Sequence, residues 1–596
     1  MTLQYTAPLD DMRFIMQDVF DVEKLWQSLP ALAHVDMDTV SMILAEAGKF
    51  ASEVVLPLNQ SGDDESATYH GDGVVRVPAG FKQAYSQYAE SGWIGLGGDV
   101  NYGGQGMPKT VTMLTEEMLL SANQSFSLYP NLTVGATLSL LAVADDEQKN
   151  TYLPKLYTGE WSGTMCLTEA HSGTDLGIIK TRAVPNADGS YAITGTKIFI
   201  TGGEHDLTEN IIHLVLAKTP NAPAGSKGIS LFVVPKFMVN ADGSLGERNA
   251  VSAGSIEHKM GIKASATCVM NFDGATGYML GKENTGLAAM FVMMNYERVT
   301  MGLQGLGAME LAYQNAVIYT KDRTQGRSDT GVQAPDKAAD PIIHHGDVRR
   351  MLLSAKTFAE ASRCLAMYAA RELDIAKFSD DDTDKARASA KVALITPIVK
   401  AFLTDRGLEA AVDCQQCFGG HGYIKEWGME QIVRDVRISQ IYEGTNGIQA
   451  LDFIARKVIK DNGAALKSYL AEIEDVLESM PAHAIQSAAQ QAVSDLKTLT
   501  DELLAKAKTD PALYNGVAVD YLQAAGYVSF AYMFCLIVKA VDDKAADDKA
   551  AYDKAGEFYT NKLTLATHFA ERILPRYYAH ANAVRAGNGA LSAYVF

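Results

Sequence analysis

Apolar residues recur at helical spacing along most of the chain, and one central segment departs from that period. Over residues 39–156 and 287–460 they recur every three or four positions, which predicts amphipathic helices. Residues 161–281 instead hold short β-branched runs separated by turn signals, a pattern typical of a small antiparallel sheet. A polar stretch at 326–340 interrupts the second helical region and is expected to be an exposed loop. Alanine-rich helical spacing fills 461–596.

These changes of period predict an α+β fold built from consecutive domains. A chain of 596 residues exceeds what a single hydrophobic core usually supports. The predicted parts are an N-terminal extension (1–38), an N-terminal helical domain (39–160), a middle antiparallel β domain (161–282), a helical bundle (283–460) and a C-terminal helical domain (461–596).

One segment, Tyr521 to Val538, is almost uncharged and approaches the length of about 20 residues that a membrane span needs. Gln523, Gly526, Ser529 and three tyrosines interrupt it, so we predict a buried core helix and no transmembrane segment. The N-terminal residues are acidic where a signal peptide would be basic and then apolar. A cytoplasmic location is therefore expected.

Composition narrows the class of protein further. The net charge of −19 disfavours nucleic acid and anionic membrane surfaces as primary partners. Six cysteines in so long a chain are no disulfide framework and fit a reducing compartment. Neither GxGxxG nor GxxxxGK[ST] occurs, and the nearest approach to GxGxxG, Gly302-Leu-Gln-Gly-Leu-Gly307, lies in a helical pattern. Cys414 and Cys417 have no second CxxC, so they are expected to be ordinary helix cysteines and no metal site is predicted.

Four segments carry groups suited to binding a heterocycle and a phosphate or to supplying a carboxylate. Residues 165–175 offer hydroxyls, a glycine and backbone amides for a heterocycle edge and a phosphate. Residues 195–203 place an aromatic ring and a hydroxyl two positions apart, on one side of a strand. Glycines at 418–422 let backbone approach a phosphate, and 441–446 place a carboxylate beside a flexible glycine. Each segment alone has an ordinary structural explanation.

Taken in order, these segments resemble motifs of the acyl-CoA dehydrogenase family. They correspond to the family's T-E-P-x-x-G-S-D loop, K-x-W-I-T strand, R-x-Q-F-G segment (here 323–327) and Q-x-x-G-G loop (here 416–420). Residues 259–265 and 435–445 match as well, and the likeness covers roughly residues 40 to 460. The two ends resemble a long subgroup that includes 3-methylmercaptopropionyl-CoA dehydrogenases and related bacterial fatty acyl-CoA dehydrogenases.

The resemblance implies an FAD-dependent oxidoreductase of the kind used in fatty acid β-oxidation. Such an enzyme forms a trans-2-enoyl-CoA from an acyl-CoA thioester, here 3-methylmercaptopropionyl-CoA or a fatty acyl-CoA, and passes electrons to electron-transfer flavoprotein. It also implies a helical domain, a β domain, a four-helix bundle and an extra C-terminal helical domain, assembled as a homo-oligomer with a dimer favoured. Two alternatives remain: an acyl-CoA oxidase that uses oxygen, and a flavin-holding nucleic-acid-binding scaffold of the same fold. The scaffold would want a basic C-terminal domain, whereas this one is acidic.

By the same resemblance, Glu443 is the base that removes the substrate's α-proton. Some branches of the family use an acid at the position of Glu297 instead, and those branches usually lack the glutamate of the Y-E-G-T motif, so Glu443 is favoured. FAD would be bound by Leu167, Thr168, Gly173, Thr174, Phe199, Thr201 and Thr445, and that of a neighbouring subunit by Arg323, Gln416, Gly419 and Gly420. Substrate would contact Asn295, Arg298, Tyr442 and Gly444.

Three residues depart from the family pattern. Phe199 replaces the usual tryptophan, which keeps a ring but removes an indole donor. Gly326 replaces the phenylalanine of R-x-Q-F-G and a long insertion follows it. Gly447 stands where a glutamine is common after Y-E-G-T. None of these changes removes a group that the reaction needs.

Overall fold

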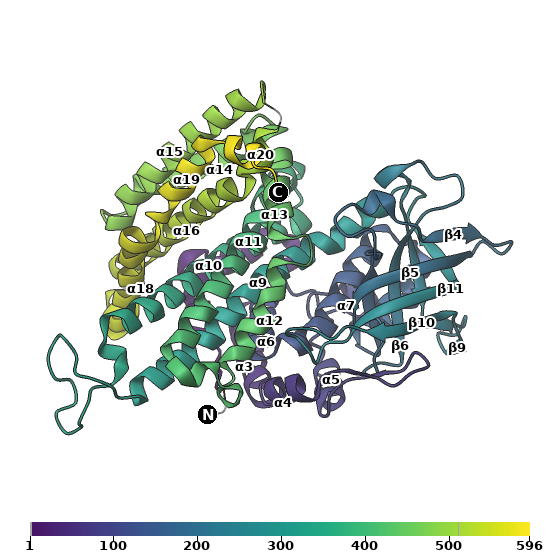
Figure 1. Ribbon diagram of the computed structural model, residues 1–596, viewed down its shortest axis with the longest axis horizontal. Coiled ribbons are helices and arrows are strands. Elements are labelled where there is room, and N and C mark those ends of the chain that lie inside the picture. Colours follow the sequence, from purple (N-terminus) through teal and green to yellow (C-terminus); the bar gives the residue numbers. More distant parts are fainter. Residues whose placement is uncertain (1–2, 511) are drawn as a thin grey trace. The chain divides into compact units, whose positions relative to one another are not determined.

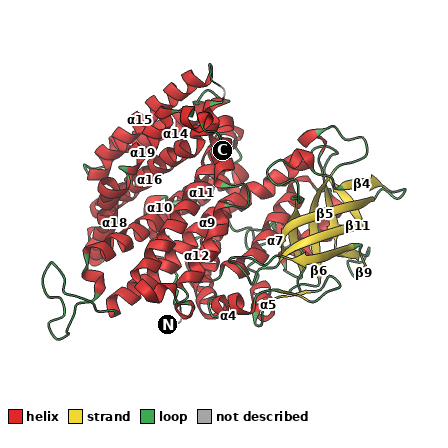
Figure 2. Ribbon diagram, in the orientation of Figure 1, coloured by secondary structure: helices red, strands yellow, loops and turns green. Residues whose placement is uncertain are grey.

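The computed structural model describes residues 3–510 and 512–596, which form two compact units (Figures 1 and 2). The first unit contains the chain up to Lys49, the segment Lys109–Ser121 and everything from Met301 onward. The second unit contains Phe50–Pro108 and Ala122–Thr300.

The second unit is built around a seven-stranded sheet, whose strands are among those coloured yellow in Figure 2. Its order is β3-β6-β7-β11-β5-β4, with β10 beside β11. All pairs are antiparallel except β3 with β6, so the prediction of an antiparallel sheet is wrong for that pair. The β4–β5 hairpin separates β3 from β6 along the chain. This connection lets β6 run parallel to β3. The strands are β3 (Trp161–Cys166), β4 (Arg182–Pro185), β5 (Tyr191–Thr201), β6 (Asn210–Ala217), β7 (Ser230–Pro235), β10 (Val251–Ile256) and β11 (Thr267–Leu280), with small pairs β1 (Thr68–Tyr69) with β2 (Val75–Arg76) and β8 (Phe237–Val239) with β9 (Leu245–Arg248).

Two helices of this unit begin at side-chain caps. The Asn123 side chain accepts a hydrogen bond from Phe126 N (3.0 Å), and Asp145 and Gln148 form a capping box. The predicted helical character of this region is confirmed, although the pair β1–β2 went unpredicted. The helices are α4 (Leu58–Glu65), α5 (Phe81–Glu90), α7 (Gln124–Val143) and α8 (Asp146–Tyr157).

The first unit is helical, and its core is formed by long helices that pack on one another. The expected loop at 326–340 is part of the connection between two helices that are consecutive in the chain. It folds around the buried carboxylate of Asp340, which accepts the backbone N–H groups of Ser328, Gln333 and Ala334. The helices are α1 (Leu9–Phe14), α2 (Val22–Ser28), α3 (Met37–Phe50), α6 (Lys109–Ala122), α9 (Gly286–Asp322, which begins in the second unit), α10 (Gly346–Phe378), α11 (Asp382–Cys417), α12 (Met429–Arg437) and α13 (Asn446–Leu451), followed by a π-helical turn (Asp452–Ile459).

The glycines of Gly302-Leu-Gln-Gly-Leu-Gly307 allow helices to approach closely. A Cβ at Gly302 would meet Val399 O at 2.8 Å, and one at Gly305 would meet Leu403 O at 2.6 Å, both on α11. A Cβ at Gly307 would meet the α6 backbone at 2.8 Å. The run is therefore a packing motif inside α9. It is not the strand-to-helix turn that binds the phosphates of a dinucleotide.

The region after Asp461 is helical, as predicted, and its central helix is α16 (Leu513–Asp547). Residues of Tyr521–Val538 are buried almost without exception, which confirms the prediction of a core helix. Among the described residues, α7 and α16 have the length and composition of a membrane span, but 72% and 89% of their apolar windows are buried inside the protein. Within this region the neighbours of α16 are α14 (Ala464–Ser479), α15 (Ala484–Ala507), α17 (Lys549–Lys554), α18 (Gly556–His568) and α19 (Arg576–Ala586), and α20 (Gly589–Ala593) ends the described helices.

Candidate active site

In the second unit, the loop after β3 is held against β5 by a buried ion pair. Lys197 Nζ lies 2.9 Å from Glu169 Oε1 and donates to the carbonyl of Leu167 (2.9 Å). The backbone N–H of Ile198 donates to the carbonyl of Thr168 (2.9 Å). Two of the predicted cofactor-binding residues, Leu167 and Thr168, therefore sit on a fixed stretch of backbone.

The Glu169 carboxylate is the centre of this anchor. It also accepts Lys180 N (2.7 Å), Thr181 N (3.0 Å) and the Thr181 hydroxyl (2.6 Å). Burial by itself would raise the pKa of Glu169, but Lys197 and these hydrogen bonds outweigh it and lower that pKa to about 2. The carboxylate is therefore ionised and paired at neutral pH.

Phe199 occupies a β-bulge on the same strand. Cys268 pairs with Ile200 but Met270 with Lys197, so β5 has one extra residue here. Phe199 adopts a left-handed backbone conformation (φ 59°) and its side chain is 59% exposed. Lys197 and Ile200 are buried, whereas Phe199 is exposed and Thr201 half-buried, as expected for two residues that share the outer side.

Further along the loop, Gly173 and Thr174 are exposed. A Cβ at Gly173 would meet no atom within 4 Å, so a ligand can approach the backbone there. The exposed ring of Phe199 and this open backbone suit a flat heterocycle with an attached phosphate.

Helix α9 carries the second candidate base and the two predicted CoA contacts. Glu297 is buried, and a Cβ at Gly135 of α7 would meet Glu297 Oε1 at 2.5 Å, so the carboxylate lies against the α7 backbone. Arg298 Nη1 donates to Asn295 Oδ1 (3.3 Å), and its guanidinium lies 5.5 Å from the ring of Phe291.

In the first unit, Glu443 lies in a tight turn before α13. Both Glu443 and Gly444 have left-handed backbone conformations, with φ of 55° and 78°. The buried side chain of Gln449 donates to the carbonyls of Glu443 (3.1 Å) and Gly444 (3.4 Å). Thr445 caps α13, its hydroxyl accepting Ile448 N (3.3 Å). The loop therefore presents Glu443 from a fixed, strained backbone.

Side chains on both flanks tie this turn to the long helices. The Tyr442 hydroxyl donates to Gln304 Oε1 of α9 (2.6 Å). The Asn446 amide donates to Asp405 Oδ1 of α11 (2.7 Å), while Lys400 Nζ donates to Asn446 Oδ1 (2.8 Å). Because Gln304 and Lys400 are buried, the turn is fastened to the core of its unit.

The ends of α9 and α11 come together at the remaining predicted positions. The rings of Tyr319 and Phe418 stack with centroids 4.2 Å apart, and the Tyr319 hydroxyl lies 2.9 Å from His421 Nδ1. This contact joins the segment of Arg323 to that of Gln416, and both side chains are exposed. Next to them Gly419 (φ 56°) and Gly420 are open, since a Cβ at either position would meet no atom within 4 Å.

Comparisons with known proteins agree with this arrangement of motifs. Family models match as the acyl-CoA dehydrogenase N-terminal domain (37–160), middle domain (164–275) and C-terminal domain (284–459), and as an acetyl-CoA dehydrogenase C-terminal-like domain (453–594). A 3-methylmercaptopropionyl-CoA dehydrogenase of Ruegeria pomeroyi is 40% identical over 99% of this chain and 100% of its own. The chain belongs to the acyl-CoA dehydrogenase family.

Two further relatives extend the comparison. The broad-specificity linear acyl-CoA dehydrogenase FadE5 of Mycobacterium tuberculosis is 34% identical, with 96% of each chain covered. The crystal structure of a Bacillus anthracis acyl-CoA dehydrogenase complexed with FAD has a TM-score of 0.72 at 21% identity, covering 94% of this chain and 90% of that one. The fold of an acyl-CoA dehydrogenase with an added C-terminal helical domain is thus confirmed over nearly the whole length.

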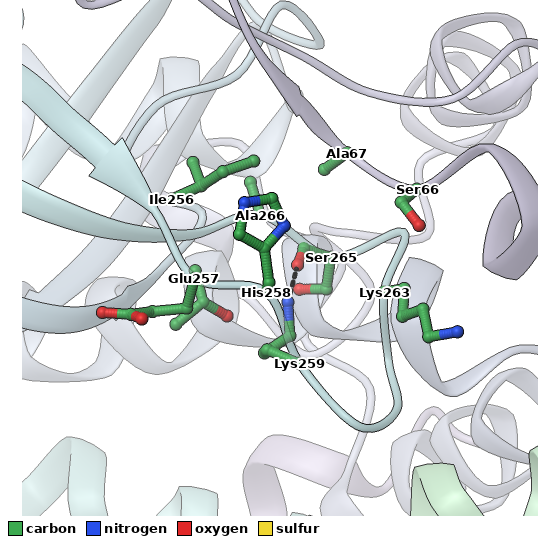
Figure 3. Close-up of a pocket in the computed structure, with 10 residues that line it drawn as sticks. Ser66, Ala67, Ile256, Glu257, His258, Lys259, Lys263, Ser265 and Ala266 are labelled. Carbon is green, nitrogen blue, oxygen red and sulfur yellow. Dashed lines mark hydrogen bonds between the residues drawn. The ribbon is translucent and has the colours of Figure 1, made fainter.

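A separate cavity of about 210 Å³ in this acyl-CoA dehydrogenase is not the site of the predicted chemistry (Figure 3). Residues of the family-like segment 259–265 form one wall, and Ser66 and Ala67 lie opposite. Lys259 Nζ donates to the carbonyl of Ser265 (2.7 Å), which ties the segment back on itself. The described residues that line this cavity include none of the predicted site residues, and its volume is below the roughly 300–1,000 Å³ of ligand pockets.

The cysteines of this family member lie in the protein interior. All six are free and buried, and Cys414 and Cys417 lie in α11, as the sequence predicts for helix cysteines. Burial raises the pKa of the Cys417 thiol to about 12. Within the part of the chain that the structure describes, no three His, Cys, Asp or Glu side chains are grouped to hold a metal ion.

Sequence reasoning missed the residues that fasten the site. Lys197 and Glu169 stand inside the family-like motifs, and a charged residue in the middle of a buried strand was an available signal. Asp405 and Gln449 gave no such signal. Asp405 reaches the Glu443 turn from α11, and Gln449 reaches it from within α13, so neither belongs to the motif of Glu443.

Proposed function

We propose that this protein catalyses the FAD-dependent α,β-dehydrogenation of an acyl-CoA thioester, with Glu443 as the base. The observation that carries the proposal is the backbone of Glu443: a non-glycine residue is held at φ 55° next to Gly444, within the motif of the family's base. Such strain persists where surrounding structure fixes it, and Gln449 and Asn446 supply that structure here.

The task of Glu443 is to take the α-proton of the thioester. A thioester α-proton is a weak acid, so the developing negative charge on the carbonyl oxygen must be stabilised while the proton leaves. We propose that the backbone N–H of Glu443 donates to that oxygen and that Tyr442 and Gly444 frame the thioester. Exclusion of water by bound substrate strengthens both effects.

FAD, when bound, accepts the β-hydride at its N5 atom. The residues proposed to hold it have the open backbone and exposed ring that a flavin and its pyrophosphate require. They are Leu167, Thr168, Gly173, Thr174, Phe199, Thr201 and Thr445, with Arg323, Gln416, Gly419 and Gly420 contributed to the FAD of a second copy in a homodimer. Asn295 and Arg298 are proposed to contact the CoA portion.

The acyl group is proposed to be either the thioether chain of 3-methylmercaptopropionyl-CoA or a linear fatty acyl chain. The first is the substrate in the name of the relative from Ruegeria pomeroyi, and the second is that of the relative from Mycobacterium tuberculosis. Electron-transfer flavoprotein is the proposed electron acceptor, and the cytoplasm the proposed location. The boundaries 1–38, 39–160, 161–282, 283–460 and 461–596 are proposed as the functional domains.

The test is anaerobic bleaching of the flavin absorbance in purified holoenzyme. The panel contains acyl-CoAs from butanoyl to palmitoyl and 3-methylmercaptopropionyl-CoA, mixed with wild type, Glu443→Gln and Glu297→Gln. We expect rapid bleaching of wild type by one class of thioester and a loss of about 10²–10⁴-fold in rate in Glu443→Gln. Glu297→Gln, as the matched control on α9, should keep most of the rate.

Three outcomes would change the proposal. Loss of bleaching in Glu297→Gln alone would move the base to α9. Fast reoxidation of the substrate-reduced flavin by oxygen, without an acceptor protein, would make the enzyme an oxidase. Retention of flavin without bleaching by any thioester would overturn the catalytic proposal and favour a flavin-holding scaffold.

A further inference from the structure

Helix α16 of the C-terminal region lies along α11, the helix that supports the Glu443 turn. Gly526 permits the close approach, because a Cβ there would meet the ring of Phe402 at 2.4 Å. One residue further, the Tyr527 hydroxyl accepts a hydrogen bond from Arg406 Nη1 (2.7 Å), and the rings of Tyr527 and Phe402 meet edge to face at 4.9 Å. The two helices are therefore packed on one another at this point.

At the edge of that interface, the Asp405 carboxylate accepts hydrogen bonds from three side-chain amides. Gln523 Nε2 of α16 donates to Asp405 Oδ2 (2.6 Å). Gln440 Nε2 and Asn446 Nδ2, which flank the Glu443 turn, donate to Asp405 Oδ1 (2.7 Å each). One oxygen of the carboxylate thus faces the C-terminal region and the other faces the turn.

The connection continues from Asn446 to Glu443. Asn446 is the first residue of α13, and its amide also donates to the Thr404 hydroxyl (3.0 Å) and to the Ala401 carbonyl (3.2 Å). One turn later on the same helix, Gln449 donates to the carbonyl of Glu443 (3.1 Å). The position of the Glu443 backbone therefore depends on where α13 begins, and α13 is anchored at Asp405.

A glutamine at position 523 would be unfavourable if its side chain served only to fill space between the helices. It is 5% exposed on an otherwise apolar stretch of helix, and within the described part of the chain its Oε1 atom has no hydrogen-bond partner. A buried amide with one unmatched atom costs stability, whereas leucine would fill the same space without a polar atom. The gain that offsets this cost is the charge-assisted hydrogen bond to Asp405.

We propose that Gln523 is a positioning residue: through Asp405 and Asn446, the C-terminal helical region fixes the turn that presents Glu443 for proton abstraction. The proposal rests on the proposed function of Glu443. Gln523 fixes one oxygen of Asp405, so that the other is aimed at Gln440 and Asn446 and the turn has one conformation. Proton abstraction is sensitive to displacements of about 1 Å, so a turn that samples several conformations reacts slowly even when it binds substrate.

The experiment compares Gln523→Leu with Tyr527→Phe in the full-length holoenzyme. Tyr527→Phe is the matched control, because it also removes one hydrogen bond between α16 and α11 but touches no part of the Asp405 network. Three quantities are measured: the rate of anaerobic flavin reduction by the best thioester, the Kd for that thioester, and hydrogen–deuterium exchange of residues 440–451. Gln523→Asn, which shortens the side chain by one methylene, replaces Gln523→Leu if the latter does not fold.

We expect Gln523→Leu to slow flavin reduction by about 10–100-fold and to speed exchange in 440–451, with flavin content and Kd changed by less than about threefold. Tyr527→Phe should leave the reduction rate and the exchange of 440–451 near wild type. In an Asn446→Ala background, Gln523→Leu should add little further loss, because both act through Asp405.

Equal behaviour of Gln523→Leu and Tyr527→Phe would overturn the proposal, and so would additive losses in the double variant. A wild-type enzyme that no thioester bleaches would refute the proposed function instead. In that case the exchange of 440–451 still decides whether Gln523 orders the turn.

Discussion

Several residues of the family-like motifs hold backbone conformations that side chains rarely adopt. Glu443, Phe199 and Ile262 have φ of 55°, 59° and 46°. Each such residue costs roughly 1–2 kcal/mol relative to an ordinary conformation. Glu443 and Phe199 stand at predicted site positions, which indicates that backbone geometry there is kept at the expense of stability.

At Glu443 this cost is measurable by substitution. We expect Glu443→Gly to be more stable than Glu443→Ala by about 1 kcal/mol, because glycine adopts a positive φ without strain. Both variants should lose flavin reduction. Urea unfolding of the two gives the difference, and the pair Glu297→Gly and Glu297→Ala is the control. In the helix interior at Glu297 the order reverses, with the glycine variant less stable by about 1 kcal/mol. The same order at both positions would contradict the strain at Glu443.

The Lys197–Glu169 pair makes the free energy of unfolding depend on pH in the acidic range. The pKa of Glu169 is about 2 in the folded protein, below its ordinary value of 4.5. Its contribution to stability is therefore fully present above about pH 4.5 and is lost as the pH falls toward 2. In Lys197→Met the buried carboxylate loses its cation, so its folded-state pKa rises, and the stability deficit of this variant should shrink as the pH falls and the carboxylate takes up a proton. We expect a cost of about 3–5 kcal/mol at neutral pH and a lower flavin content.

Urea unfolding between about pH 4 and 7 measures how this deficit varies with pH. Lys218→Met is the matched control, because Lys218 Nζ donates to the Gly177 carbonyl of the same loop (2.6 Å). That variant should cost about 1 kcal/mol and leave the pH profile in place. A pH profile of Lys197→Met that superimposes on that of wild type would show that Lys197 does not hold Glu169 ionised.

At the scale of elements, periodicity predicted the helices and the sheet, but their exact contacts came from residues far apart in the chain. The bulge at Phe199 left no mark in the alternation of β5, since it depends on pairing with β11. Asp405 joins side chains 35, 41 and 118 residues away, which no local pattern encodes. Gln523 was visible only as a polar interruption of an apolar run, whereas Glu443 could be proposed as the base because its motif is contiguous.

The close approach of α9 and α11 leaves no room for a single added methyl group at Gly305. A Cβ at Gly305 would lie 2.6 Å from Leu403 O and 2.9 Å from its carbonyl carbon, and backbone cannot rotate away as a side chain can. We expect Gly305→Ala to lower the free energy of unfolding by about 1–3 kcal/mol. Since Gln304 next to it holds Tyr442, flavin reduction should slow as well. Gly556→Ala, at an open position in α18, should be neutral or slightly stabilising in the same urea titration. Equal effects of the two substitutions would contradict the tight crossing.

At the scale of the first unit, a buried network of charges joins segments from opposite ends of the sequence. Arg363 of α10 binds Glu117 of α6 (2.6 Å) and Glu310 of α9 (2.8 Å). Asp11 of α1 lies 2.6 Å from Lys356 of α10 and 2.7 Å from Lys562 of α18. The N-terminal segment, predicted only as an extension, is thus a structural part of the helical unit, and Phe14 packs edge to face on Phe558 (5.6 Å).

Lys562 is the cation that brings the C-terminal helices into this network. It is 2% exposed and also pairs with the buried Glu360, so its removal leaves two carboxylates short of a partner inside the protein. We expect Lys562→Met to lower the free energy of unfolding by about 3–5 kcal/mol, since breaking a buried pair costs far more than a surface one. Lys549→Met, which removes an exposed partner of Asp553, should change it by less than about 0.5 kcal/mol. Because burial raises the pKa of Asp11 but its cations lower it further, the deficit in Lys562→Met should shrink as the pH falls and the Asp11 carboxylate takes up a proton. Urea unfolding at neutral and acidic pH measures both effects, and a deficit independent of pH would mean that Lys562 acts by packing on Phe14 and Phe558 and not by its charge.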